Sequence, residues 1–492
     1  MSSYLLAVAL FAPLLGVLLA LPVPRERIAY HRLVGVVFIL LSSLAVFAAA
    51  ASFNLGAKGM QLVENLPWIP ALGVRFHLGV DGLSLPLLVM TTLVSLLVVL
   101  SSWNWRTRVK EYFILILLLQ TGMLGVFVSL DLFLFFFCFE LTLIPMYFLI
   151  GIWGGARKDY AAVKFILYTG LGSAIMFIAF LALRLSGGTF SFTRLAAVAA
   201  GFPPAFQWAV FLALFLAFAI KTPIVPFHTW LPDAHVEAPT QASMLLAGVL
   251  LKMGTYGILR LNFTLFPAVA HAFAPVLAVF AVVNVLYGAF LAMAQRDLKK
   301  MVAYASISSM GYVLLGAAAG TNIALDGAVL QMFTHGLVSA FMFFAVGIIY
   351  ERAHTRQIPE LGGLAGRMPL WAWSTLIGAL CYLGLPGLGI FASEFTVFLG
   401  SYAVLPWATI LAGAGIVLTA GYLLYMGERV LFGPLRPTLA GLPDARGWVE
   451  ILPMVSLIGL MLAVGIFPAS LGQFINPAMG HLAQLLKGGA IS

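Results

Sequence analysis

Long apolar runs dominate the chain and are separated by short polar segments that carry most of the charged residues. Most runs reach the roughly 20 residues that an α-helix needs to cross the hydrocarbon core of a bilayer. Because no basic residue precedes the first run, we expect it to stay in the mature protein rather than act as a cleaved signal peptide. The pattern predicts an all-α polytopic membrane protein with 14 transmembrane helices, at about residues 3–21, 32–53, 83–103, 112–130, 132–152, 161–185, 205–226, 240–260, 267–293, 301–319, 327–350, 370–400, 403–427 and 450–474.

The composition supports a membrane protein and excludes several kinds of cysteine-based site. Of 492 residues, 62% are hydrophobic and 9% are charged, whereas an ordinary soluble domain carries roughly 25% charged residues. Cys138 and Cys381 lie in separate apolar runs and form no CxxC pair. A disulfide framework and a cysteine-based zinc or iron–sulfur site are therefore excluded.

The net charge of +9 is best explained by topology. Loops after odd-numbered predicted spans hold 17 of the 26 Lys and Arg residues. The opposite loops hold 6, including Lys58 and also Arg260 at the end of its span, and Lys164, Lys221 and Lys252 lie within spans. Basic residues favour the cytoplasmic side of a membrane. We therefore expect both termini on the periplasmic side of a bacterial inner membrane, contacts with membrane lipids and no nucleic-acid partner.

Five titratable residues lie near the middle of five different predicted spans: Glu140, Lys221, Lys252, His335 and Glu394. An ionised side chain at the bilayer centre costs at least about 2.5 kcal/mol, so such residues are rare and face a protein interior or water. Carboxylate, ammonium and imidazole groups linked by water can each bind and release a proton. We therefore predict a proton-translocation site, while a structural ion pair that locks two helices is the alternative for any one residue.

Two predicted spans contain helix-breaking residues at mid-depth. Residues 221–226 read KTPIVP, and residues 384–389 read GLPGLG just before Glu394. Interruptions in corresponding places indicate an internal repeat around a central transport site, although a kink needed only for packing is the alternative. We expect broken helices at spans 7 and 12. We also expect two inverted five-helix repeats at 112–262 and 263–432, between a three-span segment with an outer loop at 1–111 and a final span with a tail at 433–492.

Several other polar features give weaker signals. Lys164 lies only a few residues into its span, where snorkelling to the headgroups and a proton role explain it equally well. Asp131, between two spans, is interpreted as a helix cap. His228 and His235 lie in a proline-rich segment without a known ligand spacing, so we expect no metal. GLPGLG lacks the strand context of a dinucleotide motif, and no phosphate-binding loop or haem motif occurs.

Seven segments between about residues 75 and 475 form a recognisable set: FFCFELTLIPMYFLIG at 136–151, YAAVKF at 160–165, KTPIVPFHTWLPDAH at 221–235, EAPT at 237–240, LKMGTYG at 251–257, DLKKMVAY at 297–304, and GLPG at 384–387 followed by Glu394. With these segments the chain resembles the antiporter-like membrane subunits of respiratory complex I. The acidic residue Glu394 makes it most similar to the M type, because the L and N types and the multisubunit antiporters carry lysine at this position. The chain ends after the last predicted span, so the long lateral helix of the L type is not expected.

The resemblance implies roles for the buried residues. It implies that Glu140 pairs with Lys221, and that Lys252 passes the proton toward Glu394. His335 matches a histidine between two half-channels. The secondary candidates are His228, His235 and Lys164. Many members carry a histidine where this chain has Ser309, which cannot titrate.

The resemblance also implies an activity and partners. It implies a proton-translocating subunit of NADH:quinone oxidoreductase, driven by quinone reduction in neighbouring subunits. This chain would hold no cofactor, since FMN, iron–sulfur clusters and quinone are expected in partner subunits, and the flanking antiporter-like chains L and N would be its neighbours. A subunit of a multisubunit Na⁺(K⁺)/H⁺ antiporter, and a purely structural membrane subunit, are the alternatives.

Overall fold

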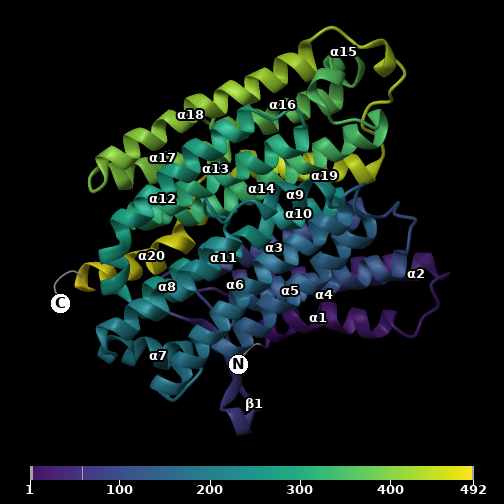
Figure 1. Ribbon diagram of the computed structural model, residues 1–492. Coiled ribbons are helices and arrows are strands. Elements are labelled where there is room, and N and C mark those ends of the chain that lie inside the picture. The colour runs from purple at the N-terminus through teal and green to yellow at the C-terminus, as the bar shows by residue number, and fades with distance from the viewer. Residues whose placement is uncertain (1–3, 58, 490–492) are drawn as a thin grey trace.

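The protein is a bundle of long helices that run roughly parallel or antiparallel to one another (Figure 1). The computed structural model describes residues 4–57 and 59–489, so Lys58 lies outside the described residues. Among the described residues, twelve helices are long and apolar enough to cross a membrane. They are α2 (Ile28–Ala51), α3 (Ser84–Ser101), α4 (Val109–Val128), α5 (Leu132–Trp153), α6 (Lys158–Gly187), α8 (Pro204–Lys221), Thr240–Phe263, α12 (Pro267–Met293), α13 (Leu298–Ala319), α14 (Asn322–Ala353), Pro406–Phe432 and α19 (Trp448–Ile466).

Two further expected spans are present as shorter helices. The first is α1 (Leu5–Ala20), which lies with α2 at one edge of the bundle, opposite α18 (Pro406–Met426) in Figure 1. The span expected at 370–400 is divided into α16 (Pro369–Leu383) and α17 (Gly389–Tyr402). The remaining short elements are α7 (Phe192–Val198), α9 (Trp230–Glu237), α15 (Leu364–Arg367), η2 (Ala199–Gly201), η5 (Ile358–Glu360), η6 (Gly427–Phe432) and η7 (Pro437–Leu439).

The expected end of the last span is wrong. That span was placed at 450–474, but α19 ends at Ile466 and a separate helix, α20 (Ala469–Gly489), follows. Pro468 causes the break, because proline disfavours the helical conformation of the residue before it, here Phe467. The predicted tail is therefore a helix. Its apolar stripe of Ile475, Met479, Leu482 and Leu486 is buried against the bundle.

The expectation of an all-α fold is wrong for one segment, where β1 (Gln61–Ile69) and β2 (Val74–Val80) form an antiparallel hairpin. The strands are joined by η1 (Pro70–Leu72) and Gly73, whose φ of +69° favours glycine. β1 shows no apolar alternation, because its one buried side chain is Glu64. The Glu64 carboxylate accepts hydrogen bonds from the backbone N–H groups of Leu6 (3.0 Å) and Ala7 (3.2 Å). The hairpin therefore caps α1, the first helix of the bundle.

Two corners of the bundle are built in the same way. Asp131 caps α5 by accepting from two of its N–H groups, at 2.9 and 3.2 Å, which confirms the predicted cap. Asp297 caps α13 in the same manner, at 2.8 and 3.1 Å. Each aspartate also pairs antiparallel with the chain that follows the next two helices, at Ser191 and at Gln357. Five long helices separate the corners, so they lie at opposite ends of the bundle.

A buried ion pair ties the hairpin end of the bundle to a central helix. Arg260 was counted as a loop residue, but it lies inside η4 (Ile258–Phe263) and pairs with Asp81, which follows β2. Its Nε also donates to the Tyr256 hydroxyl at 3.2 Å. Burial by itself raises the pKa of Asp81, but Arg260 and the N–H groups of Leu83 and Ser84 lower it overall. The pair therefore fixes the helix over Thr240–Phe263.

We expect Arg260→Gln to destabilise the bundle strongly, because it leaves Asp81 buried without a counter-ion, which costs about 3–5 kcal/mol. Adding Asp81→Asn should recover most of the loss. Since the pKa of Asp81 is lowered, its contribution is present above about pH 4, the ordinary value, and is lost as the pH falls through the native pKa. Thermal unfolding of the purified complex in detergent measures this, with exposed Arg367→Gln as the control. Equal melting temperatures for the Arg260 and Arg367 variants would contradict it.

Candidate functional site

Two of the five predicted site residues are in direct contact in the centre of the bundle. The Nζ of Lys252 donates to Nδ1 of His335 at 2.8 Å and to the carbonyl oxygen of Ala247 at 2.5 Å. The other ring nitrogen of His335, Nε2, lies 2.9 Å from the hydroxyl of Tyr382. That hydroxyl lies 3.2 Å from Oγ of Ser306. A hydrogen-bonded series thus joins four helices, and Lys252 and His335 are completely buried.

The local shape of the helix around Lys252 makes this contact possible. Lys252 lies in α11 (Leu251–Gly257), between the π-helical turns η3 (Leu246–Leu250) and η4. Such turns loosen the regular hydrogen-bond ladder and occur often at functional sites. A Cβ on Gly248 would lie 3.3 Å from the Gly336 carbonyl oxygen. The two glycines therefore let this helix approach α14 closely enough for Lys252 to reach His335.

Lys221 is buried at the first broken helix, and Glu140 is half-buried on α5. Lys221 ends α8, and its Nζ lies 5.0 Å from the ring centre of Phe139 and 5.8 Å from that of Phe165. The charges of Lys221 and Glu140 are close enough to interact. Among the described residues, however, they form no ion pair within 4.0 Å, and neither Nζ of Lys221 nor Oε1 of Glu140 has a hydrogen-bond partner. The buried ammonium of Lys221 and one shielded oxygen of Glu140 are thus left without a hydrogen bond in the part of the chain that the structure describes.

The break after Lys221 is held open by a residue that the sequence analysis missed. The chain leaves the helical path at Thr222 and resumes it at Trp230, where α9 begins. The amide of Asn284 on α12 donates to the Pro223 carbonyl at 3.0 Å and accepts from the Val225 N–H at 2.8 Å. This one side chain replaces hydrogen bonds that the prolines remove. The sequence feature that could have identified Asn284 is that it is a lone asparagine in an otherwise apolar span.

Glu394 belongs to a separate polar group on the same side of α14. Gln331 donates to its Oε1 at 3.4 Å, and Gln331 in turn accepts from Ser393. Ser393 lies 2.9 Å from the hydroxyl of Thr334, which precedes His335 in the chain. Within the described part of the chain, no hydrogen bond connects this group to Tyr382. α14 therefore contributes residues to both groups, but no hydrogen bond between described residues joins one group to the other.

The second break lies between α16 and α17, next to Glu394. Gly384 and Gly387 have φ of +82° and +91°, which other residues adopt at a cost. A Cβ on Gly384 would lie 3.5 Å from Oε2 of Glu394. The glycine-rich sequence thus turns the backbone and keeps it close to the carboxylate.

The secondary candidates have different surroundings. His235 is fully buried and stacks on Phe343 at 4.3 Å between ring centres, and its two nitrogens have no hydrogen-bond partner among the described residues. His228 lies edge-on to Tyr287 at 5.7 Å. Lys164 forms an ion pair of 2.7 Å with a carboxylate on α9, Asp233, in place of a headgroup contact. In the residues that the structure describes, no cluster of three His, Cys, Asp or Glu side chains is arranged for a metal.

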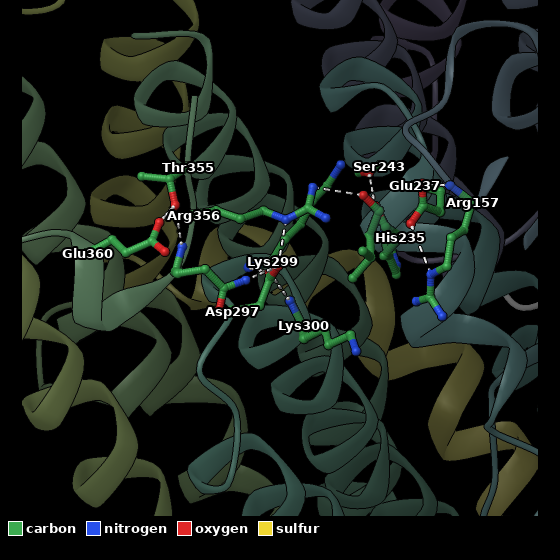
Figure 2. A network of polar contacts seen from close by, with 12 residues as sticks. Arg157, His235, Glu237, Ser243, Asp297, Lys299, Lys300, Thr355, Arg356 and Glu360 are labelled. Atoms are coloured by element: carbon green, nitrogen blue, oxygen red, sulfur yellow. Dashed lines mark hydrogen bonds and ion pairs between the residues drawn. The ribbon is translucent and has the colours of Figure 1, made fainter. Parts of the chain in front are cut away.

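A polar network that sequence reasoning did not foresee fixes the segment around His235 (Figure 2). Lys299 donates to the Ala238 carbonyl at 2.5 Å. Arg356 pairs with Asp297 at 2.6 Å and donates to the Val236 carbonyl at 3.0 Å. The network joins the corner at the start of α13 to the chain between α9 and α10 (Thr240–Leu245). Its basic residues were counted only as loop charges.

Known proteins resemble this chain over nearly its whole length. The family model described as NADH:quinone oxidoreductase/Mrp antiporter, transmembrane, matches residues 129–419. NADH-quinone oxidoreductase subunit M of Rhodobacter capsulatus is 40% identical, over 94% of this chain and 92% of the relative. NAD(P)H-quinone oxidoreductase chain 4 1 of Synechococcus elongatus is 43% identical, over 96% and 91%.

Two solved structures share the fold. A chain in respiratory complex I from Thermus thermophilus superposes with a TM-score of 0.88 and 31% identity, covering 98% of this chain and 99% of that chain. A chain of the Mrp complex from Dietzia sp. gives a TM-score of 0.87 with 23% identity, covering 99% of each chain. At 23% identity, the similarity to the Mrp chain shows a shared fold and nothing more.

We expect Gly254→Ala to disturb the contact between the helices that carry Lys221 and Lys252. The new Cβ would lie 2.5 Å from Oγ1 of Thr222 and 2.8 Å from the Phe218 carbonyl oxygen, so the end of α8 must move. Overpacking of this kind costs about 1–3 kcal/mol. Gly170→Ala on α6 is the control, because nothing lies within 4 Å of its Cβ position and alanine favours helix by up to about 1 kcal/mol. Melting temperatures of the complex should fall for Gly254→Ala only, and equal values would contradict the expectation.

Proposed function

The chain belongs to the family of antiporter-like membrane subunits shared by NADH:quinone oxidoreductases and Mrp antiporters, and we propose that it is the proton-translocating M-type subunit of an NADH:quinone oxidoreductase. The relatives at 40% and 43% identity are named as subunit M and chain 4 of such enzymes. The observation that carries the proposal is the buried contact between Lys252 and His335, continued by Tyr382. It places three groups that can exchange protons where no lipid or bulk water reaches.

The proposed topology has 14 spans, with α1 and the divided pair of α16 and α17 added to the twelve long helices. Two inverted five-helix repeats are supported by the corners at Asp131 and Asp297, where the same number of residues separates the partners of each β-bridge. Both termini would lie on the periplasmic side of a bacterial inner membrane, as the loop charges indicate. The repeats would occupy residues 112–262 and 263–432.

Proton loading is assigned to Lys221 and Glu140. Each side chain has a polar atom without a hydrogen-bond partner among the residues that the structure describes. A proton that arrives from the cytoplasm therefore changes the attraction between Lys221 and Glu140 without breaking a hydrogen bond of either atom. Lys164 and His228 near this position, and His235 between it and the centre, are secondary carriers. His235 has two free ring nitrogens among the described residues, which suits a group that accepts and donates in turn.

Proton transfer at the centre follows from the short contact between Lys252 and His335. Two cations 2.8 Å apart repel strongly in a buried site. The two groups therefore share one excess proton. When Lys252 gives its proton to Nδ1 of His335, the imidazole releases its Nε2 proton to the Tyr382 hydroxyl, which passes its own proton on in the same step. Ser306 and Ser309 beside Tyr382 continue the hydrogen bonds but cannot hold a charge. Transfer onward to Glu394 requires bridging water, because no hydrogen bond joins the Gln331–Ser393–Glu394 group to Tyr382 among the described residues.

Energy for the transfer would come from neighbouring subunits. This chain would hold no redox centre, and FMN, iron–sulfur clusters and quinone would lie in partner chains. Flanking antiporter-like chains of the L and N types are the expected neighbours. A change of charge in such a neighbour is the simplest signal that can alter a buried proton site laterally.

The second candidate is a subunit of a multisubunit Na⁺(K⁺)/H⁺ antiporter, which the fold likeness to the Mrp chain favours. Such a subunit would need no electron donor. Proton exchange in membrane vesicles that depends on Na⁺ and proceeds without NADH would select this alternative.

We expect Glu140→Gln and Lys221→Ala each to abolish NADH-driven turnover and proton uptake without loss of the assembled complex, because each removes one proton-binding group. The double variant should be equally inactive. NADH oxidation and proton uptake are measured in vesicles at matched amounts of complex on a native gel. If the residues form only a structural pair, removing both restores activity, because a whole buried pair is tolerated better than half of one. Recovery in the double variant would therefore contradict the proposal.

A further inference from the structure

A basic cavity lies at the hairpin end of the bundle and takes no part in the proton route. Its volume is about 530 Å³, and it opens between the turn of the hairpin, the end of α6, and α7. Three arginines line it: Arg75 on β2, Arg184 near the end of α6, and Arg194 on α7. The fold thus gathers three positive charges from three separate segments into one cavity.

Little nearby charge compensates these arginines. The Nε of Arg75 donates to the neutral amide oxygen of Asn65 at 2.5 Å. The guanidinium of Arg184 lies 5.6 Å from the ring centre of Phe190, and Arg194 is exposed. Within the described ranges, none of the three forms an ion pair of 4.0 Å or less.

One carboxylate, that of Asp131, also lines the cavity, but its oxygens are already engaged. Oδ1 accepts from two N–H groups of α5, and Oδ2 accepts from the backbone N–H of Arg75 at 3.1 Å. Both oxygens therefore hold the backbone in place. The guanidinium groups remain available to an anion, which they bind through two parallel N–H donors each.

The wall beside the cavity is apolar and faces outward. Trp68 of β1 packs edge-on against Phe137 of α5, with 5.7 Å between ring centres. Phe137 is 48% exposed, and Leu185, which follows Arg184, is 85% exposed. Tryptophan is typical of the membrane–water interface. Basic groups beside an exposed apolar surface match a ligand that is anionic at one end and apolar at the other.

We propose that this cavity binds the phosphate headgroup of an anionic phospholipid, whose acyl chains lie along the exposed surface of α5 and α6. Phosphate offers the bidentate geometry that guanidinium groups prefer. The headgroup lies between the hairpin and α7, so the lipid bridges the hairpin to the helical bundle. The apolar wall distinguishes this ligand from free phosphate, which makes no use of Leu185 or Phe137.

The test uses the intact complex in nanodiscs of phosphatidylcholine that contain a photoactivatable phosphatidylglycerol. After illumination, mass spectrometry measures the lipid attached to the segment that contains Leu185. We expect labelling of the wild type and at least a tenfold lower yield in the double variant Arg184→Gln/Arg194→Gln. Arg367→Gln, an exposed arginine elsewhere, is the matched control and should label as the wild type does. NADH oxidation should be unchanged in all three, which verifies assembly.

Three results would overturn the proposal. Equal labelling of the double variant would mean that the arginines do not hold the lipid. Loss of labelling in the wild type upon addition of millimolar inorganic phosphate would identify a site for a small soluble anion. Absence of lipid labelling in the wild type, together with cross-linking of this segment to a peptide of another subunit by an added bifunctional reagent, would show that a neighbouring protein fills the cavity.

Discussion

Every polar group buried among these helices must find its partner inside the protein, because lipid offers none. The structure meets this requirement in most places. Asp81 neutralises Arg260, Asn284 supplies the hydrogen bonds that the first broken helix lacks, and Glu64 caps the first helix from a distant hairpin. The helix that carries Lys252 is held at one end by the Asp81–Arg260 pair, so the position of the central lysine depends on these contacts. Stability and the geometry of the site thus come from the same interactions.

The groups assigned to proton transfer differ chemically from those that only hold the fold. Arg260 faces a carboxylate and cannot lose its proton at physiological pH, so it is suited to a permanent pair. Lys252 instead donates to a neutral imidazole and a carbonyl, which leaves it able to give up a proton. The buried Nζ of Lys221 and the shielded Oε1 of Glu140 have no hydrogen-bond partner within the described ranges. Polar atoms without hydrogen bonds destabilise a fold and are kept mainly at functional sites. The proposed proton route connects these positions.

The sequence predicted the parts of the fold that follow from local composition. Apolar length located the helices, and proline and glycine runs located both breaks, because these properties act within a few residues. It did not predict the hairpin, whose first strand buries only Glu64, or the end of α19 at a single proline. The contact between Lys252 and His335 depends on two glycines on different helices, which no local pattern reveals. Tyr382 was missed because a neutral hydroxyl costs little to bury in a span, so its presence there does not indicate a functional site. Charged residues in apolar runs were found because burial of a charge is costly wherever it occurs.

The most direct test of the proton route is proton uptake by membrane vesicles energised with NADH, comparing Lys252→Met with the wild type at matched amounts of assembled complex. Methionine keeps most of the side-chain volume but cannot bind a proton. Lys487→Met, on the exposed side of α20, is the control for the chemical change. The account predicts that proton uptake and NADH oxidation are lost for Lys252→Met and kept for Lys487→Met. Normal uptake in the Lys252 variant would show that protons do not pass through the centre of this bundle.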